Sequence, residues 1–219
     1  TVAILDGNKL PAAFGHGTMV AGIIRAVAPT SRIMPLKAFR ADGTSNLSDI
    51  IRAIYYAVDH GASVINMSFS LAEPSPALED AIRYATDRNV VCVSSSGNLG
   101  KKTTVYPAAL KYVIGVGSVG PTDKRSVFSN WGENCARTSA PGEAVITTYP
   151  GNNYAGVWGT SFSTAFVSGG VALMNQISTR LRYDKVKDAL NHGKKISQGM
   201  GDARLDLEEA LETYWKTQH

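Results

Sequence analysis

In the segment VVCVSSSGN (Val90–Asn98), an apolar run leads directly into serines, a glycine and an asparagine. A short segment that is apolar at consecutive positions is typical of a strand covered on both faces, as in a parallel sheet. Ligands of such sheets bind beyond the carboxyl ends of the strands. We therefore expect a buried strand at Val90–Ser94 whose end presents polar groups to a site.

Similar apolar runs recur along the chain, with helix-period segments between them. The other expected strands are Val2–Leu5, Ile33–Ala38, Val64–Met67 and Val113–Val119. The expected helices include Leu47–His60, a helix that starts at Ser75-Pro76, Ser161–Ile177, Asp184–Asn191 and Leu207–Trp215, and a hairpin is expected from Ala144–Tyr149 and Tyr154–Trp158. Alternating strands and helices predict an α/β fold with a mostly parallel central sheet.

Composition limits the function classes. The chain has 219 residues, a net charge of +4 and 44% hydrophobic residues, which suits one globular domain. No apolar run approaches the roughly 18 residues of a membrane span, so we expect none. Lys and Arg form no stripe with aromatics between them, which argues against nucleic-acid binding. Cys92 and Cys135 could be free or paired.

One glycine motif resembles a nucleotide-binding fingerprint but lacks the helix that this fingerprint needs. Gly115–Gly120 matches the G-x-G-x-x-G pattern of dinucleotide-binding folds and follows an expected strand. That fingerprint needs a helix to open at the third glycine, so that its N-terminus can hold the pyrophosphate. Pro121 and a polar stretch follow instead, and we expect no nucleotide.

Three reactive side chains stand where local structure could activate them. Asp6 ends the first expected strand, His16 lies between two glycines, and Ser161 begins the long helix. Each also has a common structural explanation: a turn aspartate, an exposed histidine and a serine N-cap. Asn98, at the end of an expected strand, could be a turn residue or an amide donor. Together these residues indicate a catalytic site, because they occur along the chain in the order Asp, His, amide donor, Ser.

The sequence resembles the subtilisin-like serine peptidases (the subtilase family) over nearly its whole length. The segments that carry the resemblance are Val2–Asp6, GHGTMVAGI (Gly15–Ile23), VINMS (Val64–Ser68), SSGN (Ser95–Asn98), YPA (Tyr106–Ala108), APG (Ala140–Gly142) and GTSFSTAFVSG (Gly159–Gly169).

This resemblance implies a three-layer αβα fold and a serine endopeptidase that works through an acyl-enzyme. Ser161 would attack the scissile carbonyl, His16 would act as general base and then acid, and Asp6 would orient the imidazole. The Asn98 side chain and the Ser161 N–H would form the oxyanion hole. No cofactor is required for that chemistry.

The resemblance also implies that the substrate binds as an added strand. Because the enzyme would contact mainly the substrate backbone, its specificity would be broad. The substrate-binding residues it implies are Gly43, Thr44, Ser45, Ser68, Phe69, Ser70, Ser95, Ser96 and Gly97. Substrates would be proteins or peptides, and the enzyme would be a secreted or extracytoplasmic monomer that pairs with its own prodomain.

Some features depart from the family pattern. Asp6 is followed by Gly7-Asn8 where relatives have Thr-Gly or Ser-Gly, and Ser70 stands where glycine is usual. Only nine residues separate Asp6 from His16. We expect one peptidase domain, 1–219, in which the N-terminal segment and a loop between those two residues are missing, through a true deletion or a junction. A structural calcium ion is allowed by the resemblance, with ligands unknown.

Two other functions stay open: a catalytically inactive binding or scaffold protein on the same fold, and a serine hydrolase or transpeptidase that does not cut free peptide bonds. Reaction with a fluorophosphonate and cleavage of a denatured protein would separate them.

Overall fold

The computed structural model describes residues 2–3, 13–132, 134–196 and 199–218. Its centre is a sheet of order β2-β3-β4-β5, in which every neighbouring pair is parallel. The strands are β2 (Val64–Met67), β3 (Val91–Ser95), β4 (Val113–Val119) and β5 (Thr138–Pro141). Their carboxyl ends lie at one edge of the sheet, where the candidate site forms.

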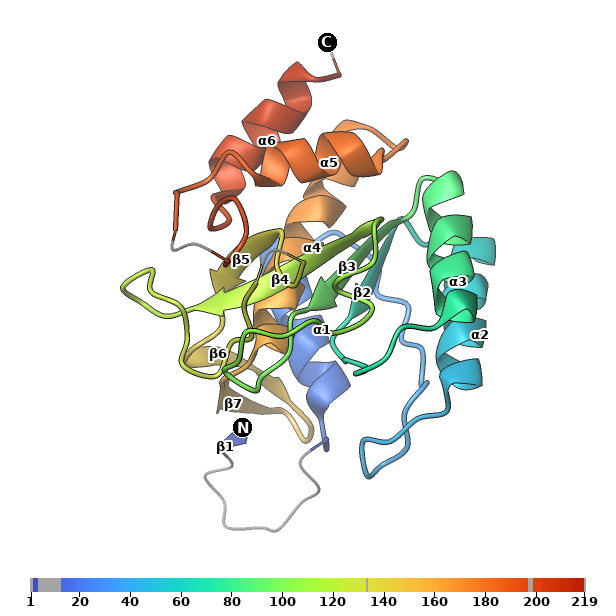
Figure 1. Cartoon of the computed structure of the whole chain (residues 1–219), viewed down its shortest axis with the longest axis vertical. Coiled ribbons are helices and arrows are strands. Elements are labelled where there is room, and N and C mark those ends of the chain that lie inside the picture. The colour runs from blue at the N-terminus through green and yellow to red at the C-terminus, as the bar shows by residue number, and fades with distance from the viewer. Residues whose placement is uncertain (1, 4–12, 133, 197–198, 219) are drawn as a thin grey trace.

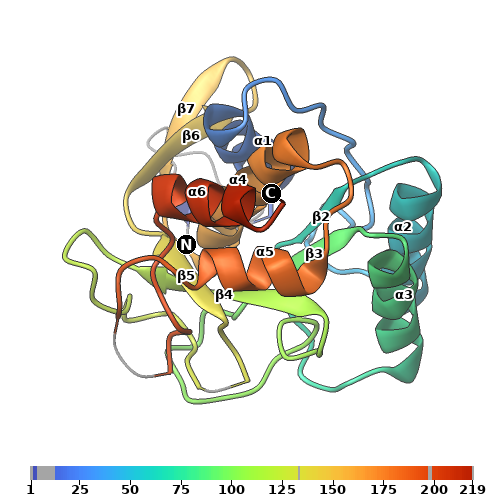
Figure 2. The same cartoon turned by 90° about the horizontal axis from the view of Figure 1, so that it is seen from above.

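Helices cover both faces of this sheet, as consecutive residues of β3 show. Val91 and Val93 pack into a core with α4 (Thr160–Ile177), α5 (Tyr183–Leu190) and α6 (Leu207–Lys216). Cys92 points the other way, into a core with α2 (Leu47–Asp59) and α3 (Pro76–Asp87). Figures 1 and 2 show α2 and α3 standing across the sheet from α4. The expected three-layer α/β fold is confirmed.

A second, antiparallel sheet lies beside the first and has the order β1-β7-β6. It contains the expected hairpin, β6 (Val145–Tyr149) and β7 (Asn153–Val157). Helix α1 (His16–Val27) packs between this hairpin and α4, where Met19 and Ile23 share a core with Phe162. The hairpin therefore supports the helix that begins at His16.

The strand expected at Ile33–Ala38 does not form, and that prediction was wrong. The segment has neither helix nor strand, and Ile33 and Met34 are each 38% exposed. Pro35, in the middle of the run, has no N–H to give to a strand ladder and disfavours any position inside a sheet.

The first strand also differs from expectation. Within the expected Val2–Leu5, the described part is β1 (Val2–Ala3), which pairs antiparallel with β7 and is not a member of the parallel sheet. The other edge of β7 is occupied by β6, and β1 takes its free edge. The rest of the expected strand lies outside the described residues.

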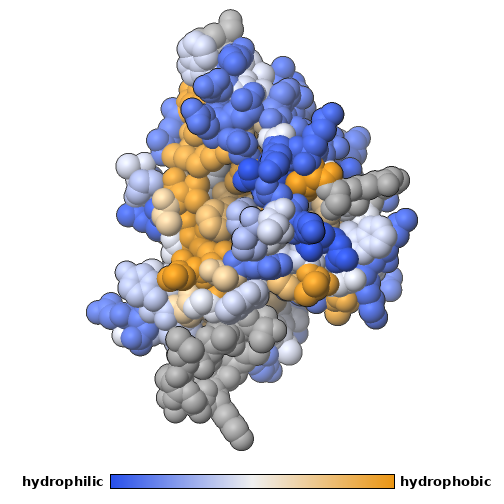
Figure 3. All heavy atoms as spheres, turned by 90° about the vertical axis from the view of Figure 1, so that its left-hand side faces the viewer, coloured by the Kyte–Doolittle hydropathy of each residue, from blue (hydrophilic) through white to orange (hydrophobic). Residues whose placement is uncertain are grey.

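Hydrophobic side chains form a continuous area on the face that lies at the left of Figure 1 (Figure 3). Among the described residues, no helix combines the length and the apolar character needed to cross a bilayer. Cys92 and Cys135 are both free and buried, and burial raises the pKa of Cys92 to about 12.

Candidate active site

Ser161 lies in the first turn of α4, a helix that runs through the protein interior. Small residues dominate its buried face, including Ser163, Thr164 and Gly169, which lets it approach the sheet closely. The preceding turn is held where the Gly159 N–H donates to the carbonyl oxygen of Gly142 at 2.9 Å. The first N–H groups of a helix lack partners within it and carry partial positive charge. The Ser161 hydroxyl therefore stands where negative charge is stabilised.

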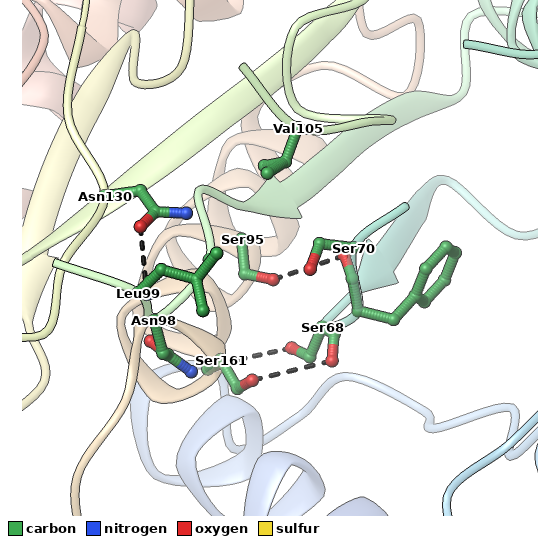
Figure 4. Close-up of a pocket in the computed structure, with 10 residues that line it drawn as sticks. Ser68, Ser70, Ser95, Asn98, Leu99, Val105, Asn130 and Ser161 are labelled. Carbon is green, nitrogen blue, oxygen red and sulfur yellow. Dashed lines mark hydrogen bonds between the residues drawn. The ribbon is translucent and has the colours of Figure 1, made fainter. Parts of the chain in front are cut away.

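Asn98 is fixed against the start of the same helix. Its Oδ1 accepts hydrogen bonds from the Thr160 N–H at 2.9 Å and from the Thr160 hydroxyl at 2.8 Å. Two donors on the oxygen decide the orientation of the amide and leave its Nδ2 on the other side. Figure 4 shows that nitrogen beside Ser161. Because the Asn98 side chain is exposed, its amide is a donor that is both oriented and reachable.

The end of β2 contacts Ser161 from the opposite side. The Ser68 hydroxyl donates to the Ser161 carbonyl oxygen at 3.0 Å, and the Ser161 hydroxyl points to the Ser68 carbonyl oxygen at 3.5 Å. Asn66 Nδ2 donates to the Ser68 hydroxyl, and Asn66 Oδ1 accepts from Ser168 of α4, each at 2.9 Å. These bonds tie the end of β2 to two successive regions of α4. At 3.5 Å the Ser161 hydroxyl itself is only weakly held, so it is free to turn towards another acceptor.

A cavity of about 270 Å³ lies between these strand ends (Figure 4). Most of the residues implied for substrate binding line it, from both walls. The described residues that line it are Ser68, Phe69, Ser70, Ser95, Gly97, Asn98, Leu99, Val105, Asn130 and Ser161.

His16 is the first residue of α1 and is brought next to α4. Its ring lies 5.9 Å, centroid to centroid, from the ring of Phe162, the residue that follows Ser161. Burial lowers the pKa of His16, which favours the neutral imidazole. A neutral imidazole is the form that accepts a proton.

Some of the expected residues are placed elsewhere. Gly43, Thr44 and Ser45 do not line the cavity; the open side of the Gly43 Cα faces the Ala13 side chain, in the segment just before α1. Ser96 is fully buried, and its hydroxyl points to the Asn130 carbonyl oxygen. Asp6 lies outside the described residues.

Sequence reasoning missed four residues of this region. Thr160 orients Asn98, and Leu99, Val105 and Asn130 line the cavity. The signal for Thr160 was its position next to Ser161 in the GTS segment, and Val105 directly precedes the YPA segment. No local pattern marks Asn130 as a cavity residue.

The structure assigns no metal ligands among the residues it describes. No group of three or more His, Cys, Asp or Glu side chains among them could hold an ion. We therefore assign no ligands to the calcium ion that the sequence resemblance allows.

A serine at the positive end of a helix, with an oriented amide beside it, suits attack on a carbonyl and stabilisation of the resulting oxyanion. This fold and this site geometry suit one class of protein, the serine hydrolases built on an αβα sandwich.

Comparison with known proteins narrows the class. The profile of the Subtilase family matches residues 5–208. A thermophilic serine proteinase from Bacillus sp. (strain AK1) is 38% identical over 80% of this chain and 47% of its own length. Subtilisin BL from Lederbergia lenta is 35% identical over 91% of this chain and 74% of its own length. The chain thus spans about half of the first relative and three quarters of the second.

Solved structures agree with these sequences. The prenylagaramide maturation protease PagA superimposes with a TM-score of 0.83, at 28% identity, over 97% of this chain and 91% of its own. A lanthipeptide protease gives the same TM-score at 26% identity, over 90% of this chain and 75% of its own. The chain belongs to the subtilase family, a family of serine endopeptidases.

Proposed function

We propose that this protein hydrolyses peptide bonds in proteins through a Ser161-His16-Asp6 triad and an acyl-enzyme. The observation that carries the proposal is the paired hydrogen bond from Thr160 to Asn98 at the start of α4. It places an oriented amide donor beside the Ser161 hydroxyl, which is what the attack on a carbonyl requires.

In the first step the Ser161 Oγ attacks the scissile carbonyl carbon while His16 takes the hydroxyl proton. The carbonyl oxygen becomes an oxyanion, held by Asn98 Nδ2 and the Ser161 N–H. His16 then gives its proton to the leaving amine, and the acyl group remains on Ser161. A water molecule, activated by His16 in the same way, attacks the acyl-enzyme and releases the second product. No step needs a cofactor.

Asp6 is the proposed partner of His16. Burial and the positive end of α1 both disfavour the imidazolium that forms during attack. A carboxylate against the ring offsets both effects and fixes its tautomer. The need for such a partner supports the role of Asp6.

The substrate would bind as an extended strand between Gly43–Ser45 and Ser68–Ser70, held by main-chain hydrogen bonds that tolerate many sequences. The position of Ser68–Ser70 on one wall of the cavity supports this half of the arrangement. Ser95 and Gly97 would form the opposite wall. The buried Ser96 would support that wall from behind through its hydrogen bond to Asn130.

We also propose a domain organisation, an oligomeric state and a cellular location for the protein. Residues 1–219 would form one peptidase domain, act as a monomer outside the cytoplasm and be matured from a form with a prodomain. A structural calcium ion would stabilise the domain without entering the chemistry.

The test compares the parent with Ser161→Ala. We expect the parent to degrade a denatured protein and Ser161→Ala to lose that activity. Ser48→Ala, an exposed serine of α2, is the matched control and keeps it. A folded parent that cleaves nothing would support an inactive scaffold instead. Reaction with a fluorophosphonate without cleavage of any peptide would favour a transferase or another hydrolase.

A further inference from the structure

The cavity has an end that lies away from Ser161, and one side chain closes it. In Figure 4 Val105 stands across the cavity from Ser161 and Asn98. Val105 is only 6% exposed, and it packs with Ala108 and Cys135 behind the cavity wall. A side chain wedged in this way cannot move aside for a ligand.

The backbone around Val105 is fixed as well. Its neighbour Tyr106 exchanges two backbone hydrogen bonds with Leu71, at 2.7 and 2.9 Å. Leu71 directly follows Ser70 on the β2 side of the cavity, so the segment that bears Val105 is tied to that wall. The end of the cavity cannot lengthen without breaking this pairing.

The width of the cavity is set by two other contacts. The Ser95 hydroxyl donates to the Phe69 carbonyl oxygen at 3.4 Å and so bridges the two walls. Asn130 Oδ1 accepts from the Leu99 N–H at 2.9 Å and holds the loop after Asn98. Gly97, at φ +90°, has no room for a side chain because Asn130 already occupies the space.

The described residues that line the cavity are all uncharged. The Phe69 ring packs on Phe39, 5.3 Å away between centroids, and belongs to the α2–α3 core. Leu99, 68% exposed, is an apolar residue on the open side next to Asn98. The whole cavity, about 270 Å³ including the space at Ser161, is below the usual 300–1,000 Å³ of ligand pockets. A charged side chain would lose its hydration here without meeting an opposite charge among the described lining residues, and the unpaired Asn130 Nδ2 is a neutral donor.

We propose that Val105 sets the length of this pocket, and that the enzyme selects peptides with a short, uncharged residue, such as Ala or Val, before the scissile bond. The inference rests on the proposed function, since it assigns the cavity to the residue that donates the acyl group. Backbone binding would leave the other positions of the substrate broad.

The test uses peptide anilides that differ only in the residue before the cleaved bond: Ala, Val, Phe, Lys or Glu. We expect the parent to show the highest kcat/KM with Ala or Val, at least about 10-fold above Phe, Lys and Glu, the scale of discrimination that a hydrophobic pocket gives per methylene. A parent that prefers Phe, Lys or Glu would overturn the inference.

Variants then test Val105 itself. Val105→Gly should raise the Phe-to-Ala ratio of kcat/KM by about 10- to 100-fold, and Val105→Ala by less. Val127→Ala, an exposed valine (84%) outside the cavity, is the control and should leave the ratio unchanged. An unchanged ratio in both Val105 variants would refute the role of Val105. If Val105→Gly does not fold, the specificity of the parent and the Phe-to-Ala ratio of Val105→Ala still test whether Val105 sets the pocket length.

Failure of the proposed function would look different. In that case the parent would cleave none of the anilides and would not react with a fluorophosphonate. A parent that reacts with the fluorophosphonate and cleaves the anilides with another preference would support the proposed peptidase function. It would refute only the assigned specificity of the pocket.

Discussion

Helices α1 and α4 each carry a residue proposed for catalysis in the first turn, but these two turns are held differently. At α4 the Thr160 N–H is capped by Asn98, from the end of β3, and Ser68 contacts Ser161 from the end of β2. At α1 the cap is Gly15, without a side-chain hydrogen bond among the described residues, and the first turn contains no acid. Two strand ends thus contact the start of α4, whereas we propose that His16 relies on Asp6, which precedes its helix in the sequence.

This contrast indicates which part of the site is preorganised. The groups proposed to stabilise an oxyanion are held by hydrogen bonds between strand ends and α4, so we expect their loss to lower kcat with little effect on folding. His16 carries a pKa lowered by burial, so on its own it is a weak base. Its strength would come from Asp6.

The largest expected effect is at the α1 start. Asp6→Asn should lower kcat about 10⁴-fold, the scale for this member of the Ser-His-Asp template. It should also lower the midpoint of the acid limb of the pH–rate profile. His16 accepts a proton only above its pKa, which burial pushes down and a carboxylate pushes up.

The pH profiles of the parent and of Asp6→Asn give the measurement, and NMR titration of His16 in a Ser161→Ala background checks the assignment. Identical midpoints with and without the carboxylate would show that Asp6 does not act on His16.

The next effect is at the α4 start. Asn98→Ala should lower kcat by about 10²–10³-fold with KM little changed, a range whose reference case is a subtilisin asparagine. The reason is that the amide would contact the oxyanion and not the ground-state substrate. Steady-state kinetics on one peptide substrate measure it. A loss confined to KM would contradict the oxyanion role.

Thr160→Val tests positioning without touching the substrate. It removes the hydroxyl bond to Asn98 Oδ1 and keeps the N–H bond. We expect kcat to fall about 5- to 10-fold, the worth of one such bond, and KM to stay. Thr164→Val, which removes a threonine hydroxyl bond one turn later in α4, is the matched control.

A double variant sharpens this test. With Asn98 already replaced by alanine, Thr160→Val should cost nothing further in kcat, since the two residues act as one unit. Additive losses would place Thr160 in a different role.

The smallest expected effect comes from the end of β2. Ser68→Ala removes a hydrogen bond to the Ser161 carbonyl oxygen and takes away the acceptor of the Asn66 Nδ2 donor, while Asn66 Oδ1 keeps its bond from Ser168. We expect kcat/KM to fall by about 3- to 5-fold and Tm to fall by a few degrees. Kinetics and thermal unfolding would show it. A loss as large as that of Asn98→Ala would mean that both strand ends contribute equally.

Much of the fold follows from sequence where local and tertiary preferences agree. Val113–Val119 forms a strand with the expected bounds because all seven residues are buried in the sheet. The equally apolar Ile33–Ala38 fails at Pro35. Strand β5, Thr138–Pro141, escaped prediction because TSAP has no apolar run and is strand only through pairing with β4.

The site shows the same limit. Residue types and family resemblance bring Ser161, Asn98 and Ser68 to one place, and the structure puts them around one cavity. The hydrogen bond that orients Asn98 joins residues 62 apart in sequence, and Val105 reaches the cavity only through the pairing of Tyr106 with Leu71. Neither contact leaves a local pattern.

Catalysis as proposed depends above all on the Ser161 hydroxyl as the nucleophile. The most direct measurement is to treat the folded protein with a fluorophosphonate and locate the adduct by peptide mass spectrometry. We predict one adduct, on Ser161, absent from Ser161→Ala and slowed in Asn98→Ala. An adduct on another residue, or none on a folded protein, would contradict the account.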